Sequence, residues 1–310
     1  MPTILITGGT GLIGKNLSRH LTGKGYEVII LSRNPPHSSD NAMISYAAWD
    51  IEKQTIDAAA FSKADHIIHL AGAGVMEKKW TKKYKNVIVE SRTKSSELII
   101  KFLKEHTNKV RSVITASAIG WYGNNSKPLV HPDGFKETDP AAKDFLGETC
   151  MLWENSIAGA TALNKRLVKL RMGIVLSNDG GAFSEFKNPL RFGIAAILGS
   201  GKQIISWIHI DDLCRMYITA IENANISGSY NAVAPLPVTN KNLMIKTANA
   251  IRGKFYIPVH VPQFLLQLIL GQRSIEILKS ATVSYEKIKD AGFTFLYPTI
   301  DAALTELTKK

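Results

Sequence analysis

The stretch ITGGTGLIGKNL, residues 6–17, decides the fold of this chain. The apolar run TILIT (3–7) leads into it, glycines occupy positions 8, 9, 11 and 14, and a helical pattern follows from Leu12. A strand, a glycine-rich turn and a helix in this order are typical of a dinucleotide-binding loop, because the helix N-terminus offers free N–H groups and a positive dipole end to a pyrophosphate. We therefore expect cofactor contacts from Thr7, Gly8, Gly9, Thr10, Gly11, Leu12, Ile13 and Gly14.

The glycines have separate tasks in such a loop. Gly8 or Gly9 permits the tight turn after the strand, and Gly11 lets the backbone approach the pyrophosphate. Gly14 lets the helix pack closely against the strand. The spacing therefore predicts both a turn and a close helix–strand contact.

Strand and helix patterns alternate after this loop. Apolar runs at 27–32, 66–72, 111–118 and 167–176 predict strands, patterns at 12–21, 81–105 and 146–160 predict helices, and a loop is expected between the second and third strands. Strands that are apolar on both faces are typical of a buried parallel sheet. The fold class predicted is α/β, a doubly wound parallel sheet of the Rossmann type.

The alternation loosens after residue 176. We expect a helix through 183–196, a helix capped by Asp211 or Asp212, and a strand at 228–234 that returns to the sheet. This organisation predicts a dinucleotide-binding domain over 1–176, to which 205–234 returns. A smaller, mainly helical substrate lobe and C-terminal domain would comprise 177–204 and 235–310.

Composition is that of a soluble globular protein, with 310 residues, 45% hydrophobic and 21% charged. Cys150 and Cys214 form no C-x-x-C pair, so neither a disulfide framework nor a metal site is expected. The N-terminus lacks a signal-peptide pattern, and the apolar run 264–270 is too short to span a bilayer. We expect a cytoplasmic protein. Its net charge of +12 has no nucleic-acid motif beside it.

The end of the second strand indicates which cofactor is preferred. Ser32 and Arg33 stand where an Asp or Glu would accept a hydrogen bond from the adenosine ribose 2′-hydroxyl. A carboxylate there would repel a 2′-phosphate, whereas a guanidinium can bind it with two parallel hydrogen bonds. The pair Ser32–Arg33 therefore predicts NADP(H) in preference to NAD(H).

Several motifs together resemble the extended short-chain dehydrogenase/reductases, and more closely their nucleoside-diphosphate-sugar epimerase branch with its own small C-terminal domain. They are TGGTGLIG (7–14), HLAGAG (69–74), TASAIGWYG (115–123), Glu137, LRMGIVL (170–176), SWIHIDDL (206–213) and the segment 261–304. The resemblance covers essentially the whole chain. It implies that Leu70, Ala71, Gly72, Arg92 and Val175 are further neighbours of the cofactor.

The chain departs from this family where the family carries Tyr-x-x-x-Lys on a helix. The tyrosine exchanges a proton with the substrate while the lysine lowers its pKa and holds the ribose. Anchored on Glu154, the alignment places Leu146 and Cys150 at these positions, and a register one residue earlier gives Phe145 and Thr149. Neither register supplies the pair, so the usual mechanism is in doubt.

Other residues could supply the chemistry. Ser117 resembles the substrate-orienting Ser or Thr, although counting back from Tyr122 would put Ala118 there. Tyr122 is the nearest phenol, and the Cys150 thiol is a weak acid. The catalytic candidates are therefore Ser117, Tyr122 and Cys150. His209 could exchange protons or serve the structure, and Lys83 and Lys85 could attract an anionic substrate.

Two functions compete. One is an NADP(H)-dependent oxidoreductase or epimerase-like enzyme acting on a small carbonyl or nucleotide-sugar-like substrate with a rearranged acid/base set. The other is a non-catalytic NADP(H)-binding redox sensor or interaction module, which the missing pair would suit. We favour the enzyme because the glycine-rich loops at 180–183 and 199–202 exceed what a binding module needs. The partner expected is a small molecule rather than nucleic acid or membrane. By analogy with related proteins, we expect a homodimer.

Overall fold

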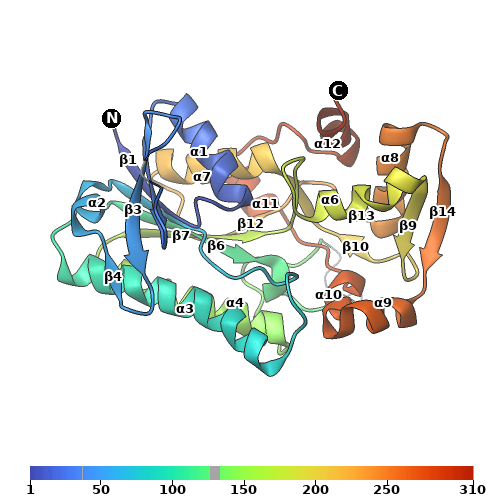
Figure 1. Ribbon diagram of the computed structural model, residues 1–310, viewed down its shortest axis with the longest axis horizontal. Helices are drawn as coiled ribbons and strands as arrows, with labels where there is room; N and C mark the ends of the chain where they lie inside the picture. The colour runs from blue at the N-terminus through green and yellow to red at the C-terminus, as the bar shows by residue number, and fades with distance from the viewer. Residues whose placement is uncertain (37, 126–132, 310) are drawn as a thin grey trace.

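The computed structural model describes residues 1–36, 38–125 and 133–309. Its main sheet has the order β12-β7-β6-β5-β1-β2-β3-β4, and every neighbouring pair is parallel except β3 with β4 (Figure 1). The strands are β1 (Thr3–Thr7), β2 (Glu27–Ser32), β3 (Ile44–Asp50), β4 (Thr55–Ile56), β5 (His66–His69), β6 (Ser112–Ala118), β7 (Arg166–Met172) and β12 (Gly228–Ala232). The predicted doubly wound α/β class is confirmed.

Helices cover both faces of this sheet (Figure 1). Alternate residues of β1 point to opposite faces, so Ile4 and Ile6 belong to one core and Leu5 to the other. The first core is closed by α1 (Leu12–Gly23) and α7 (Ile210–Glu222). The second is closed by α2 (Ala58–Lys63), α3 (Lys82–Glu105), α4 (Phe145–Ile157) and α5 (Gly159–Ala162).

Most of the remaining elements form a smaller lobe beyond the carboxyl ends of the strands (Figure 1). It contains three two-stranded sheets, which pair β8 (Ile174–Leu176) with β11 (Trp207–His209), β9 (Ile194–Leu198) with β14 (Ile257–Val261), and β10 (Ile204–Ile205) with β13 (Val238–Thr239). Its helices are α6 (Ala182–Lys187), α8 (Asn240–Arg252), α9 (Gln263–Leu270), α10 (Ser274–Leu278) and α12 (Ile300–Leu307). Helix α11 (Glu286–Asp290) packs instead against β12 of the main sheet, with Ile288 in the first core. Short 3-10 turns are η1 (Ile119–Trp121), η2 (Pro189–Phe192) and η3 (Gly271–Arg273).

Three local expectations are wrong. The strand expected over 167–176 divides at Gly173, where a Cβ atom would lie 2.7 Å from the Ser206 carbonyl oxygen, and β8 leaves the main sheet to pair with β11. The helix expected through 183–196 ends at Lys187, and after Gly193 (φ 74°) the chain becomes β9. The loop expected after β2 contains β3, β4 and α2.

The N-cap of α7 is His209 rather than Asp211 or Asp212. Its side chain accepts a hydrogen bond from the Asp211 backbone N–H. Asp212 instead is fully buried, and its carboxylate accepts hydrogen bonds from the backbone N–H groups of Leu296 and Tyr297 and from Arg215. The side chain therefore ties the end of the chain to the sheet domain.

Within the described residues, no helix is long and apolar enough to cross a membrane. The same part of the chain contains no group of three or more His, Cys, Asp or Glu side chains that could hold a metal ion.

Candidate cofactor and active site

The loop between β1 and α1 has the geometry of a phosphate cradle. Gly8 has φ +70° and lies so close to the next loop that a Cβ atom would come within 2.8 Å of the Leu70 backbone. At Gly14 a Cβ atom would lie 2.5 Å from both the Gly8 carbonyl oxygen and the Gly9 Cα atom. Gly8 therefore makes the turn and Gly14 the close helix–strand contact, as their spacing predicts.

The N-terminus of α1 is open to an anion. Gly11 is its N-cap, no side chain of the described residues caps it, and its first turn carries no acidic residue. Thr10 and Gly11 are exposed, and Leu12 and Ile13 are half-buried. The positive end of the helix dipole therefore faces a surface that the protein itself leaves uncompensated.

A buried hydrogen-bond chain holds this loop against the loop after β5. The Thr7 hydroxyl accepts hydrogen bonds from the backbone N–H groups of Leu70 and Ala71, each at 3.2 Å, and therefore donates its own proton to His69 Nδ1 at 2.6 Å. His69 Nε2 must then carry the ring proton, which it donates to Ser96 Oγ at 3.1 Å. Burial lowers the pKa of His69 to about 3 and keeps the ring neutral. Thr7 thus positions the cradle, and its fully buried side chain offers no surface to a ligand.

The end of β2 leaves Arg33 exposed, while Ser32 is half-buried and accepts a hydrogen bond from the Asn34 N–H. On the opposite side of the cradle, Gly72 is exposed and Ala71 is buried. The guanidinium of Arg33 is therefore accessible at the place where the sequence predicts contact with a 2′-phosphate.

Arg92 is a buried cation beside the Gly72 loop. Its side chain is 9% exposed, and a Cβ atom on Gly72 would lie 3.1 Å from its guanidinium carbon. It donates to the Ile88 carbonyl oxygen and lies over the Trp153 ring, but forms no ion pair with any residue the structure describes. Burial lowers its pKa. A guanidinium desolvated without a carboxylate partner suits an anionic or hydroxyl-rich ligand.

The positions of the missing tyrosine and lysine face the end of β6. A Cβ atom on Gly120 would lie 3.3 Å from Leu146 Cβ and 3.7 Å from Cys150 Sγ, and the Cys150 thiol contacts the Ala118 carbonyl oxygen at 3.7 Å. In the alternative register, Thr149 is buried and its hydroxyl donates to the Phe145 carbonyl oxygen. The geometry thus favours Leu146 and Cys150 as the residues that replace the pair. Burial raises the pKa of Cys150 to about 12, which leaves it a poor acid near neutral pH.

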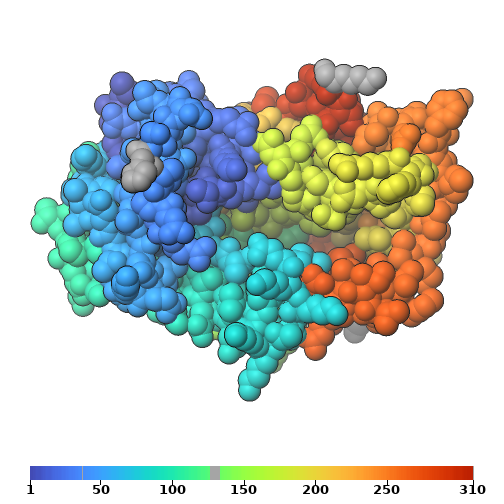
Figure 2. All heavy atoms as spheres, in the orientation of Figure 1, coloured from blue at the N-terminus to red at the C-terminus, as the bar shows by residue number. Residues whose placement is uncertain are grey.

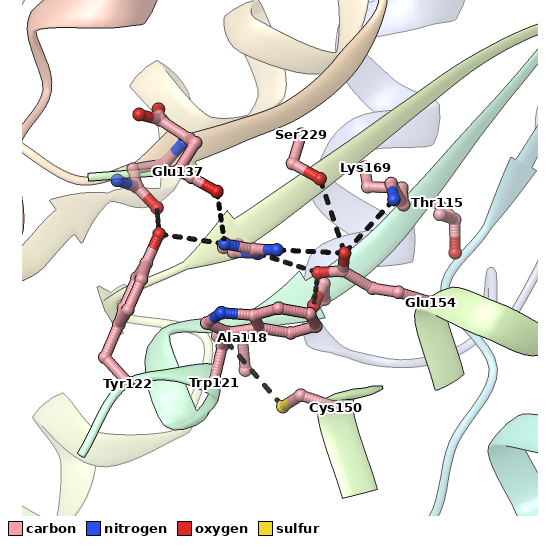
Figure 3. A network of polar contacts seen from close by, with 12 residues as sticks. Thr115, Ala118, Trp121, Tyr122, Glu137, Cys150, Glu154, Lys169 and Ser229 are labelled. Atoms are coloured by element: carbon pink, nitrogen blue, oxygen red, sulfur yellow. Dashed lines mark hydrogen bonds and ion pairs between the residues drawn. The ribbon is translucent and has the colours of Figure 1, made fainter. Parts of the chain in front are cut away.

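Behind these positions lies a buried polar network (Figure 3). The Glu154 carboxylate, 3% exposed, accepts hydrogen bonds from Arg171 Nε at 2.8 Å and Nη2 at 3.1 Å, and pairs with Lys169 at 3.2 Å. Burial alone would raise the pKa of Glu154, but the hydrogen bonds and charge of Arg171 outweigh it and the pKa is lowered. The carboxylate is therefore ionised and committed to two cations.

Two catalytic candidates belong to this network. Ser117 is fully buried and donates to Glu154 Oε1 at 2.8 Å. Tyr122 is also fully buried, donates to Asn231 Oδ1 at 2.7 Å and accepts from Arg171 Nη1 at 3.1 Å. Burial raises the pKa of Tyr122 to about 12. In this arrangement neither hydroxyl is available to a substrate, and both support the sheet end instead.

The remaining candidates are dispersed. His209 is buried, caps α7 and lies 4.0 Å from the Tyr297 ring, and burial lowers its pKa. Val175 is half-buried in β8 against the first core. Lys83 is exposed on α3, while Lys85 lies over the Phe145 and Trp80 rings. The structure places none of these four beside Cys150.

Sequence reasoning missed three residues of this site. Arg171, an arginine inside an apolar strand, is the one that left a visible signal, since a buried cation requires a partner. Lys169 and His69 are the other two. Their positions beside Glu154 and Thr7 depend on strand register and have no signal in the sequence.

A parallel sheet of this order, with an open glycine-rich cradle at the end of β1, defines a dinucleotide-binding α/β protein of the Rossmann type. A family model described as the NAD dependent epimerase/dehydratase family matches residues 4–144, and a domain of unknown function matches 261–307. Epimerase family proteins of Staphylococcus haemolyticus and Staphylococcus aureus are 33% and 34% identical to the chain, covering 99% of each chain in the first case and 100% in the second. The chain belongs to the epimerase family of the extended short-chain dehydrogenase/reductases.

Two solved structures are also similar over this whole chain. The human epimerase family protein SDR39U1, crystallised with NADPH, has a TM-score of 0.85 and 25% identity, covering 99% of each chain. The nucleoside-diphosphate sugar epimerase from Corynebacterium glutamicum has a TM-score of 0.76 and 31% identity, and covers 99% of this chain and 58% of its own. The predicted family resemblance is confirmed, including its separate C-terminal domain.

Proposed function

We propose that this protein binds NADP(H) in preference to NAD(H). The observation that carries dinucleotide binding is the cradle. Gly8 and Gly14 leave no room for a Cβ atom, and the α1 N-terminus faces outward without a capping side chain among the described residues. The exposed Arg33 supports selection of the 2′-phosphate, and the buried Arg92 would face the cofactor from α3. Leu70, Ala71, Gly72 and Val175 would complete the contacts. When bound, NADP(H) would donate or accept a hydride at its nicotinamide ring.

We propose further that the chemistry is an oxidoreductase or epimerase-like reaction on a small carbonyl or nucleotide-sugar-like compound. Membership of the epimerase family supports this class, as does the human relative that was crystallised with NADPH. The proposed reaction does not use the position of the family tyrosine, because Leu146 has no proton to give. The thiol of Cys150 and the hydroxyls of Ser117 and Tyr122 would be positioning groups rather than acids.

A second candidate function is a non-catalytic NADP(H)-binding protein. It is supported by the same burial of Ser117 and Tyr122, whose hydroxyls are already paired within the protein. The two candidates share the cofactor site and differ in turnover alone. Binding and turnover must therefore be measured separately.

Cofactor preference is tested by titrating Arg33→Ala with NADPH and NADH. We expect a loss of roughly tenfold or more in NADPH affinity, the value of a lost charge-assisted hydrogen bond, and little change for NADH. Lys104→Ala, which removes one exposed positive charge from the far end of α3, is the matched control. Equal losses for both cofactors with Arg33→Ala would overturn the preference.

Turnover is tested by adding fractionated metabolites to the NADPH-loaded protein and following the absorbance of the reduced nicotinamide. Gly11→Asp is the control, because a Cβ atom at Gly11 meets only the Gly8 carbonyl oxygen, at 3.3 Å, and Asp is a favourable N-cap. The variant should fold while its carboxylate repels the pyrophosphate. Oxidation in one fraction that Gly11→Asp abolishes supports the enzyme. Tight NADPH binding without turnover in any fraction supports the second candidate.

A further inference from the structure

Helix α9 presents apolar side chains to solvent. Phe264 and Leu268, one turn apart on the same face, are 70% and 77% exposed, and Ile269 is 57% exposed. Leu266 is the buried residue of this helix, and α9 carries no charged side chain. Ile275 on α10, a helix that contacts α9, is 61% exposed. Large apolar side chains exposed together on one helix face are typical of a site of interaction.

A cationic segment borders this surface. The residues between β5 and the first turn of α3 include Lys78, Lys79, Lys82 and Lys83, all exposed. A hydrogen bond of 2.6 Å joins this segment to η3, which follows α9: Arg273 Nη1 donates to the carbonyl oxygen of Met76. Met76 is 40% exposed. Figure 2 shows the two segments side by side along the lower edge of the molecule.

The acidic groups nearby do not neutralise this border. Glu77 is the exposed carboxylate within the lysine segment and lies within 3.3 Å of the Tyr84 hydroxyl. Glu276 of α10 is largely buried and pairs with Lys279, which also pairs with Asp144. Within the described residues 76–83, four exposed lysines therefore stand against one exposed carboxylate, that of Glu77.

We propose that α9, with Ile275 and Met76 and the four lysines, docks on a bilayer that contains anionic phospholipid. Large apolar side chains can enter the boundary between headgroups and acyl chains while neighbouring lysines bind the phosphates, and each contribution is weak without the other. The charge of the border selects this occupant, because a second copy of a chain with net charge +12 would bring the same cations to the contact. The proposed contact is peripheral, and it differs from the sequence-based expectation that no membrane takes part.

The test is flotation of the full-length protein with vesicles of phosphatidylcholine alone and of equimolar phosphatidylcholine and phosphatidylglycerol. We expect binding to the anionic vesicles alone, weakened as salt screens the lysines. Phe264→Ser combined with Leu268→Ser should reduce that binding roughly tenfold or more. Replacing Lys78, Lys79, Lys82 and Lys83 with Gln should reduce it as well.

The matched control is Phe192→Ser combined with Phe255→Ser. Both phenylalanines are 85% exposed and precede β9 and β14, at the opposite end of these strands from α9. Binding that survives in this control supports the proposal, and an equal loss in both double variants overturns it. Absence of binding to anionic vesicles also overturns it, as does a dimer in vesicle-free solution that Phe264→Ser with Leu268→Ser abolishes, since a second copy would then cover the helix.

Discussion

Replacing Glu154 with Gln should destabilise the protein far more than other carboxylate substitutions on α4. The change keeps the shape of the side chain but puts an amide N–H₂ where a carboxylate oxygen now accepts from Arg171 or Lys169. Arg171, 3% exposed, would keep its hydrogen bonds to the Tyr122 hydroxyl and the Glu137 carbonyl oxygen but lose its counter-charge.

The expected magnitude follows from the cost of leaving a buried charge unpaired. Removing one partner of a buried ion pair costs about 3–5 kcal/mol. With an unfolding entropy of roughly 2.1 cal/mol/K per residue, a chain of 310 residues loses about 1.5 °C of melting temperature per kcal/mol. Glu154→Gln should therefore lower the melting temperature by about 5–8 °C.

The assay is thermal unfolding followed by circular dichroism. Glu148→Gln, an exposed carboxylate in the first turn of the same helix, is the control and should change the free energy of unfolding by less than about 1 kcal/mol. Glu154→Leu combined with Arg171→Met should have a higher melting temperature than Glu154→Gln, because the buried guanidinium at position 171 is then absent rather than unpaired. A Glu154→Gln protein that melts within about a degree of the unmodified chain would refute the buried ion pair and return Ser117 and Tyr122 to the catalytic candidates.

Three further predictions concern the cradle and its surroundings. Gly14→Ala should abolish dinucleotide binding, since its Cβ atom would meet the loop backbone at 2.5 Å, whereas Gly23→Ala at the other end of α1, with nothing within 4 Å, should bind normally in the same fluorescence titration. Burial lowers the pKa of His66 to about 4 and of His69 to about 3, below the unfolded value of 6.5, so the unfolded chain takes up protons that the folded chain refuses. The two histidines therefore leave the free energy of unfolding unchanged above about pH 6.5 and lower it as the pH drops toward 4. A urea midpoint that declines with pH just as steeply in the double variant His66→Asn and His69→Asn would contradict this assignment. The Cys150 thiol, with its pKa raised to about 12, should react with iodoacetamide at pH 8 at least roughly a hundredfold more slowly than a free cysteine, which mass spectrometry can follow.

Strand β1, the glycine-rich cradle, α1 and β2 could be predicted because their signals are local. The glycines at 8 and 14 require a turn and a close packing contact that the structure reproduces, and β1 and β2 are continuous apolar runs. Because Asp is a common N-cap, the sequence predicts an aspartate at the cap of α7, yet Asp212 has long-range partners at Leu296 and Tyr297. Local preference gave way to a tertiary contact there.

Residues 194–198 show why the substrate lobe could not be predicted. The segment IAAIL is equally compatible with a helix or a strand, and β9 exists because β14, about sixty residues later, pairs with it. The site has the same limit. The sequence shows that tyrosine and lysine are missing, but only the register of β6 with β7 places Ser117 and Arg171 around one carboxylate.

The buried carboxylate of Asp212 has a consequence for how the chain folds during synthesis. Its backbone partners at Leu296 and Tyr297 follow it by 84 and 85 residues, and α12 completes a core that includes Trp207 of β11. In a nascent chain that has released all eight strands of the main sheet, the Asp212 carboxylate has Arg215 as a partner but still lacks the two backbone N–H groups. The dinucleotide-binding half therefore completes these hydrogen bonds only after residues 296 and 297 have been synthesised, and a stop codon before residue 296 would be expected to yield a protein that chaperones and proteases recognise as incomplete.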